Sequence, residues 1–202
     1  MIKFHLPDFY GFYSIYQGLA ELMTAHPEYF IDNCSIGSIY GCFPGQIWNG
    51  GRAISLEQTT ISNIENTING INQLGIPIRF TYTNCLLEEH HLDDLYCNIV
   101  TQIASKSKMN EILFNRPIVI DYLQKKYDGF EYIVSTTLQM RDINKINELI
   151  DSDKYKMVVI SYNDNKNLDF LKQIHNKKKV EILLNPSCVL NCPKMLKHYE
   201  II

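Results

Sequence analysis

The chain has 202 residues, of which 46% are hydrophobic and 20% charged, and its formal net charge is −3 at pH 7. These proportions are ordinary for a globular protein, and the length suits a single well-buried domain over residues 1–202. The negative charge gives no electrostatic reason to expect nucleic-acid binding. We therefore expect a small-molecule substrate rather than a nucleic acid.

The sequence carries no signal for secretion or membrane insertion. No apolar run approaches the roughly 18 residues that cross a bilayer, and the N-terminus has no continuous apolar core. We therefore expect a cytoplasmic protein without a membrane partner. In that reducing compartment its six cysteines are expected to be free thiols or metal ligands rather than disulfides.

Helical and extended patterns alternate along the first half of the chain. Apolar residues recur at three- and four-residue steps from Asp8 to Thr24, which predicts an amphipathic helix with Asp8 as its candidate N-cap. Ser55 is the candidate cap of the next helix, with Gln58 three residues later as in a capping box. The elements predicted for this half are helices over Asp8–Thr24, Ser55–Leu74 and Glu88–Ala104, and strands over Cys34–Phe43 and Ile78–Thr83.

The second half continues the alternation with shorter units. Strands separated by helical segments imply parallel pairing through right-handed crossovers. The continuous apolar runs of the last two strands fit burial on both faces. The elements predicted here are strands over Met109–Phe114, Phe130–Val134, Tyr155–Ile160 and Val180–Leu184, and helices over Ile118–Tyr127, Ile143–Ile150 and Leu168–Ile174.

These elements predict an α/β fold, namely a parallel (β/α) barrel or a partial TIM-like barrel with about six β/α units and an N-terminal helix. A full eight-unit barrel takes about 250 residues, so we expect a reduced barrel or one truncated at its C-terminus. An open barrel exposes two strand edges, which proteins usually cover. We therefore expect a homo-oligomer or a partner subunit at those edges.

Polar residues follow the predicted strands and point to a site at the carboxyl edge of the sheet. The loop after the first strand contains Trp48–Arg52, WNGGR, which either binds a ligand or forms a structural turn with a buried Trp48 and an ion-paired Arg52. Arg79 lies inside a predicted strand, so it either binds an anion or pairs with a buried carboxylate. The candidate substrate-binding residues are Trp48, Asn49, Arg52, Arg79, Asn84, Asn185 and His198.

Two cysteines follow the last predicted strand in a Cys-x3-Cys arrangement. Cys188 and Cys192 lie in a loop, and Pro193 is suited to the first position of a helix, whose dipole would favour a thiolate at Cys192. They are either metal ligands or a chance pair. A zinc site formed by Cys188, Cys192 and His198 is one alternative.

Several motifs resemble those of the peptidase U32-like proteins. They are Asn185, Cys188, Asn191–Pro193 and His198–Tyr199, and upstream Tyr40–Gly41, Trp48–Arg52, Arg79–Thr81, Thr83–Asn84 and Tyr96–Asn98. The better understood relatives in that family are iron–sulfur proteins built on a (β/α) barrel, which include subunits of oxygen-independent ubiquinone hydroxylases and RNA base hydroxylases. The resemblance implies a 4Fe–4S cluster bound by Cys188 and Cys192, although the characterised relatives place their ligands in a different pattern. Cys85 and Cys42 are the third and fourth candidate ligands, because each also follows a predicted strand at the same barrel mouth.

Three hypotheses of function follow. The first is an iron–sulfur protein in an oxygen-independent, hydroxylation-type modification, as the resemblance implies. The second is a barrel-derived accessory or binding protein with structural or zinc-bound cysteines. The third is a metal-independent α/β enzyme that acts on a small anionic substrate through Arg52 and Arg79. No nucleophile-and-base motif supports protease activity.

Overall fold

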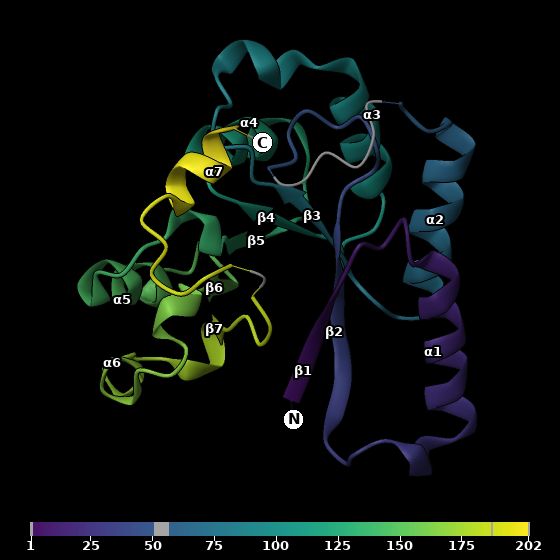
Figure 1. The fold of residues 1–202 in the computed structure, drawn as a ribbon. Coiled ribbons are helices and arrows are strands. Elements are labelled where there is room, and N and C mark those ends of the chain that lie inside the picture. The colour runs from purple at the N-terminus through teal and green to yellow at the C-terminus, as the bar shows by residue number, and fades with distance from the viewer. Residues whose placement is uncertain (1, 51–56, 187, 202) are drawn as a thin grey trace.

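The fold is a seven-stranded parallel sheet that curls into a half-barrel, as the computed structural model of the chain shows (Figure 1). The structure describes residues 2–50, 57–186 and 188–201. The strands pair in chain order, each parallel to the next, which confirms the predicted partial-barrel class. The strands are β1 Ile2–Pro7, β2 Cys34–Gly41, β3 Ile78–Tyr82, β4 Glu111–Phe114, β5 Glu131–Val134, β6 Met157–Val159 and β7 Val180–Glu181.

Helices connect the strands and lie on the outside of the curled sheet (Figure 1). They are α1 Tyr13–Ala25, α2 Ile61–Gln73, α3 Leu95–Ala104, α4 Pro117–Lys126, α5 Ile143–Asp151, α6 Leu168–Lys172 and α7 Met195–Ile201. Short 3₁₀ turns occur at η1 Pro27–Tyr29, η2 Glu89–Asp93, η3 Thr136–Leu138, η4 Tyr162–Asp164 and η5 Lys177–Lys179. Within the described ranges, no helix is long and apolar enough to span a membrane.

Helix starts follow local capping chemistry. The Asp142 side chain accepts hydrogen bonds from the backbone N–H groups of Asn144 and Lys145, which confirms the predicted start of α5. The helix predicted from Ser55 begins instead at Ile61, where Thr60 is the N-cap. Ser55 itself lies outside the described residues.

The predicted helix over Glu88–Ala104 is interrupted. Its first part forms the 3₁₀ turn η2, and α3 begins only at Leu95. The Asp94 carboxylate accepts a hydrogen bond from the backbone N–H of Cys97. A capping aspartate satisfies an N–H at a helix start, so the chain breaks and restarts at this residue.

Strand β1 was not predicted from the sequence, and this is the main difference between expectation and fold. Ile2 and Phe4 are 62% and 41% exposed, so β1 lacks the continuous apolar run of a buried strand. Asp8 was predicted to cap a helix from residue 8, which was wrong. It follows β1 with a left-handed backbone (φ 53°), and α1 begins only at Tyr13.

The last strand is shorter and more exposed than predicted. Its pairing with β6 covers only Val180 and Glu181, and Leu184 is 70% exposed. β7 is an edge strand, so the prediction of burial on both faces was wrong for it. The sheet therefore ends in β1 on one side and β7 on the other.

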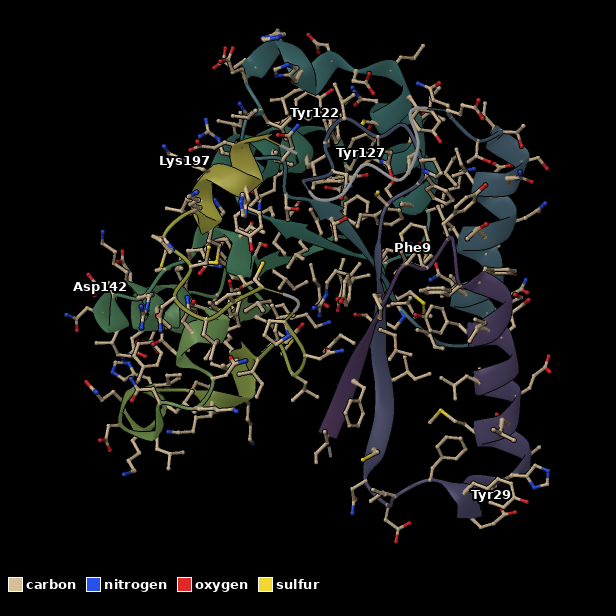
Figure 2. All side chains as sticks on the ribbon, in the orientation of Figure 1. Phe9, Tyr29, Tyr122, Tyr127, Asp142 and Lys197 are labelled. Carbon is tan, nitrogen blue, oxygen red and sulfur yellow. The ribbon has the colours of Figure 1, made fainter. Side chains whose placement is uncertain are left out.

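The two faces of the curled sheet differ in chemistry. Side chains such as Ile78, Phe80 and Tyr82 of β3 point outward into the apolar core beneath the helices. Phe9, at the junction of β1 and α1 (Figure 2), joins this core through edge-on contacts with Phe43 and Phe80. The alternate residues, including Arg79, point to the concave face, because successive strand residues face opposite sides. The concave face is therefore where polar groups collect.

Candidate functional site

A cavity of about 280 Å³ lies on the concave face of the half-barrel. Its walls are formed largely by residues at or just after the carboxyl ends of the strands, where parallel α/β sheets place their sites. The uncharged polar residues that line it are Tyr40, Asn49, Thr81, Thr83, Ser135, Thr136 and Thr137. Asp8, Arg79 and Glu181 are its charged lining residues.

Arg79 forms the floor of this cavity and is only 1% exposed. Its Nε donates to Glu111 Oε2 at 2.8 Å, and its Nη1 donates to Glu181 Oε2 at 2.6 Å. Burial alone would lower the pKa of Arg79, but the two carboxylates outweigh it and raise that pKa. Of the two sequence interpretations of Arg79, the structure therefore shows the pairing with buried carboxylates.

The floor extends sideways through Lys156, which donates from Nζ to Glu111 Oε1 at 2.8 Å and also contacts the Glu131 carboxylate. Burial would raise the pKa of Glu111, but Arg79 and Lys156 lower it overall. Three carboxylates thus face two cations in this ion network. Glu131 is 51% exposed, so the charges of Arg79 and Lys156 are balanced by the more buried Glu111 and Glu181, and neither cation is left free for an anionic ligand.

His5 of β1 joins the same network from the opposite edge of the sheet. Its Nδ1 lies 2.7 Å from Ser38 Oγ, and its Nε2 lies 3.5 Å from Glu181 Oε2. Burial lowers the pKa of His5, so the ring is neutral at pH 7. Glu181 therefore links side chains of both edge strands, β7 and β1, to Arg79 in the middle of the sheet.

One wall of the cavity is the loop between β2 and α2. Asn49 Oδ1 accepts a hydrogen bond from Thr81 Oγ1 at 2.7 Å, and the Gly50 carbonyl oxygen accepts one from Thr83 Oγ1 at 2.9 Å. A Cβ at Gly50 would lie 1.8 Å from the Thr83 carbonyl oxygen, so only glycine fits there. The loop is therefore fixed against the end of β3 by two side-chain bonds and a close backbone approach.

The opposite wall is the 3₁₀ turn η3 after β5. Ser135 Oγ accepts hydrogen bonds from Thr137 N at 3.1 Å and from Thr137 Oγ1 at 2.9 Å. Thr136 Oγ1 donates to the Ile160 carbonyl oxygen at 2.9 Å, which ties this turn to the end of β6. Three consecutive hydroxyl side chains thus border the cavity on a locally stabilised turn.

Asp8 borders the cavity at the end of β1. Its Oδ1 accepts a hydrogen bond from Gly11 N at 2.8 Å, and the side chain is half-buried. Sequence reasoning missed Asp8 as a site residue, because β1 was not predicted. Once β1 is known, Asp8 is the first residue after a strand, which is the signal that could have found it.

The predicted substrate-binding residues do not all lie at the cavity. Asn49 and Arg79 line it, whereas Trp48 is fully buried in the core. Trp48 Nε1 donates to the His91 carbonyl oxygen at 2.7 Å, and its ring meets Tyr82 edge-on. The structural-turn interpretation of this loop, with a buried Trp48, matches this placement.

The remaining predicted residues are more distant from the lining. Asn84 Nδ2 donates to the Ile47 carbonyl oxygen at 2.8 Å and so supports the loop from behind. Asn185 and His198 are exposed near the C-terminus. Arg52 lies outside the described residues.

The four predicted cluster cysteines divide into two places. Cys42 lines the cavity, and burial, with Asp8 nearby, raises the pKa of its thiol to about 12. Cys85 Sγ donates to the Tyr199 carbonyl oxygen at 2.9 Å, so it lies beside α7. In the described part of the chain, no three His, Cys, Asp or Glu side chains are grouped to hold a metal ion.

Cys188 and Cys192 lie near the same part of α7. Burial raises the pKa of Tyr162 to about 12, with smaller contributions from Cys188 and Cys192. Burial also raises the pKa of Tyr199, with a further contribution from Cys188. Cys188 therefore lies near both Tyr162 and Tyr199, Cys192 lies near Tyr162, and Cys85 contacts the Tyr199 backbone, but among the described residues these thiols do not form a group that could hold a metal ion.

Comparison with known proteins gives a structural likeness but no sequence match. No protein-family model matches the chain, and no curated protein matches it. The structure of the U32 peptidase Mk0906 superposes with a TM-score of 0.59 at 14% sequence identity, over 83% of this chain and 68% of that one. At this identity the likeness concerns the fold alone. The chain therefore has the U32-like fold that its sequence motifs led us to expect.

Proposed function

We propose that this chain binds a small polar molecule in the concave cavity. The observation that carries the proposal is the concentration of uncharged hydrogen-bonding side chains around one cavity of about 280 Å³. Ligand sites in proteins combine a concave surface with a few oriented polar groups, and α/β sheets place them at the carboxyl edge. The volume suits a metabolite rather than a polymer.

The walls are held in position before any ligand arrives. Asn49 and Thr81 are hydrogen-bonded to each other, and so are Ser135 and Thr137. Such bonds reduce the side-chain ordering that binding would otherwise require. The hydroxyl groups still have unused hydrogen-bonding capacity, since a hydroxyl offers one donor and two acceptor positions.

A cavity-filling variant tests this proposal. In Thr137→Phe, the larger ring would occupy the space beside η3, and Gln102→Phe on the exposed face of α3 serves as the matched control. Each protein is incubated with a filtered small-molecule extract of cells and analysed by native mass spectrometry. We expect a bound small molecule with the unmodified chain and the control but not with Thr137→Phe. Equal retention by all three, or no bound molecule, contradicts the proposal.

Peptidase activity, which the name of the similar structure suggests, is not what we propose. Ser38, His5 and Glu181 are arranged as a hydroxyl, an imidazole and a carboxylate, as in serine hydrolases. However, Ser38 is fully buried and is not among the residues that line the cavity. A nucleophile must reach the scissile carbonyl, so this arrangement supports the sheet rather than hydrolysis.

Metal binding by Cys188 and Cys192, with Cys85 as a third thiol, is a second proposal, supported by the position of Cys188 and Cys192 beside Tyr162 and by the family resemblance. A 4Fe–4S cluster requires four thiolates. The described geometry does not assemble that set, because no three of the described His, Cys, Asp or Glu side chains are grouped, and Cys42 lines the cavity with its thiol pKa raised. The residues as arranged do not fit the cluster, and we assign no chemical step to it.

Metal analysis decides this second proposal. The chain is purified without oxygen, reconstituted with iron and sulfide, and compared with a Cys188→Ser, Cys192→Ser double variant and with Cys34→Ser as the control. Iron and sulfide that are lost only in the double variant support an iron–sulfur site, and zinc lost in the same way supports a zinc site. The absence of bound metal in the reconstituted chain rejects both.

A further inference from the structure

The charged groups of the cavity are not balanced. Asp8 borders the cavity, and no ion pair joins its carboxylate to a cation among the described residues. At the floor, Glu111 and Glu181 balance the charges of Arg79 and Lys156, so the carboxylate of Asp8 is the unbalanced charge among the described lining residues. A ligand in this cavity therefore meets an excess of negative charge.

This excess of negative charge disfavours anionic ligands and favours cationic ones. A carboxylate or phosphate would lie between Asp8 and Glu181, and like charges in a partly buried site repel one another strongly. A protonated amine would instead form a charge-assisted hydrogen bond with the Asp8 carboxylate. The third sequence hypothesis, an anionic substrate bound through Arg79, is therefore disfavoured by the pairing of Arg79.

The floor also contains a donor without a partner. Among the described residues, the Nη2 group of Arg79 is buried and has no hydrogen-bond acceptor, although Nε and Nη1 are both paired. Buried donors are rarely left unpaired, and an absent water or ligand is a common reason. An uncharged acceptor, such as an amide carbonyl, would satisfy this donor without adding a third negative charge beside the guanidinium.

We infer that the cavity binds a small molecule with a protonated amine at the Asp8 end and an uncharged acceptor, such as an amide carbonyl, at the Arg79 end. This inference rests on the proposed function, because it names the ligand class of the same cavity. Tyr40 and Thr81 also line this cavity and can hydrogen-bond to the body of the ligand.

Four-carbon probes that differ only in their end groups test the inference. 4-Aminobutanamide carries both expected groups, butanamide lacks the amine, and 4-aminobutanoate replaces the amide with a carboxylate. Each probe is titrated at pH 7.5 by ligand-observed NMR into the unmodified chain. We expect 4-aminobutanamide to bind about tenfold more tightly than either of the other two, the ratio that one charge-assisted hydrogen bond typically gives.

A variant of Asp8 tests whether its carboxylate binds the protonated amine of the ligand. Asp8→Asn keeps the shape of the side chain, its acceptor for Gly11 N and a residue type that tolerates the left-handed backbone, so it is expected to fold. Asp169→Asn, on the exposed face of α6, is the matched control. We expect Asp8→Asn to bind 4-aminobutanamide and butanamide with equal affinity. The control should bind 4-aminobutanamide more tightly than butanamide, as the unmodified chain does.

The outcomes separate the inference from the proposed function. If 4-aminobutanoate or butanamide binds the unmodified chain as tightly as 4-aminobutanamide, the ligand class is wrong while the cavity remains a binding site. The ligand class is also wrong if Asp8→Asn keeps the full preference. If no probe binds, the ligand class is wrong, and the extract experiment with Thr137→Phe decides the proposed function on its own. If Thr137→Phe binds 4-aminobutanamide as well as the unmodified chain does, the cavity is not the site and both proposals fail.

Discussion

The inside of the half-barrel has two layers that use polar residues differently. In the lower layer, Arg79, Glu111, Lys156 and Glu181 are joined by ion pairs, three of them at 2.6 to 2.8 Å. In the upper layer, Tyr40 and other hydroxyl and amide side chains border a cavity. The lower layer satisfies its charges internally, whereas the upper layer directs hydrogen-bonding groups toward open space.

This difference assigns the stability of the sheet to the lower layer and ligand binding to the upper layer. A curled sheet whose edge strands do not pair with each other needs another way to hold its ends, and Glu181 of β7 reaches both Arg79 and His5 of β1. We infer that the lower layer replaces part of the backbone pairing that would close a barrel. The upper layer is then free to vary in chemistry, as strand-end residues do in complete barrels.

Removing the positive charge of Arg79 should have the largest effect on the free energy of unfolding. Arg79→Met leaves the Glu111 and Glu181 carboxylates buried without their partner, and we expect the free energy of unfolding to fall by about 3–5 kcal/mol. Urea unfolding followed by the fluorescence of Trp48, the single tryptophan, measures it.

Two further variants sharpen this result. Lys106→Met breaks the exposed pair of Lys106 with Glu65 and should cost at most about 1 kcal/mol. The double variant Arg79→Met, Glu111→Met removes one stranded carboxylate and should regain part of the lost stability. A loss below about 1 kcal/mol for Arg79→Met would show that the lower layer is not a stabilising element.

Gly50→Ala should have the next largest effect on the free energy of unfolding, because a Cβ there would overlap the Thr83 carbonyl oxygen. The loop would have to move away from β3, and we expect a loss of about 1–3 kcal/mol. Gly18→Ala on α1, where a Cβ meets nothing, is the matched control and should not destabilise. Equal effects of the two substitutions in urea unfolding would contradict the close approach of this loop.

Acid should weaken the lower layer in two steps. The pKa of buried His5 lies below its usual 6.5, so its contribution to stability is present above pH 6.5 and lost as pH falls through the lowered value. The pKa of Glu111 lies below its usual 4.5 despite burial, so its contribution is present above pH 4.5 and lost below it. Unfolding free energies measured from pH 8 to pH 2 should therefore fall on acidification, and His5→Gln should remove the first step. An unchanged first step in His5→Gln would exclude His5 as its cause.

A change in the upper layer should have the smallest effect on stability. Tyr40→Phe removes one hydroxyl group from the cavity lining, and we expect the unfolding free energy to change by less than about 0.5 kcal/mol. Ligand-observed NMR should nevertheless show weaker binding of 4-aminobutanamide. A large loss of stability would mean that the upper layer also holds the fold together.

The sequence predicted the parallel α/β class because five of the strands carry strong apolar or alternating patterns. It missed β1, which has no continuous apolar run, although Ile2, Phe4 and Leu6 alternate with Lys3 and His5 as in a strand with one exposed face. It overestimated β7 for the opposite reason, since an apolar run there is exposed at an edge. Edge strands are the elements for which apolar patterning is least informative.

For the site, the sequence located the carboxyl edge and three lining residues, Asn49, Arg79 and Cys42, but not the balance of charges. The partners of Arg79 come from β4 and β7, 32 and 102 residues further along the chain. Which carboxylate meets which cation depends on strand register and curvature, which no local motif encodes. The same holds for the cysteines, since Cys42 and Cys85 follow different strands and end in different surroundings.

The most direct test of the cavity as an amine-binding site is the titration of 4-aminobutanamide into the unmodified chain and into Asp8→Asn, together with the unfolding free energy of each. We predict about tenfold weaker binding to Asp8→Asn with stability unchanged within about 0.5 kcal/mol. Equal binding by the two proteins, or no binding to the unmodified chain, would contradict this assignment.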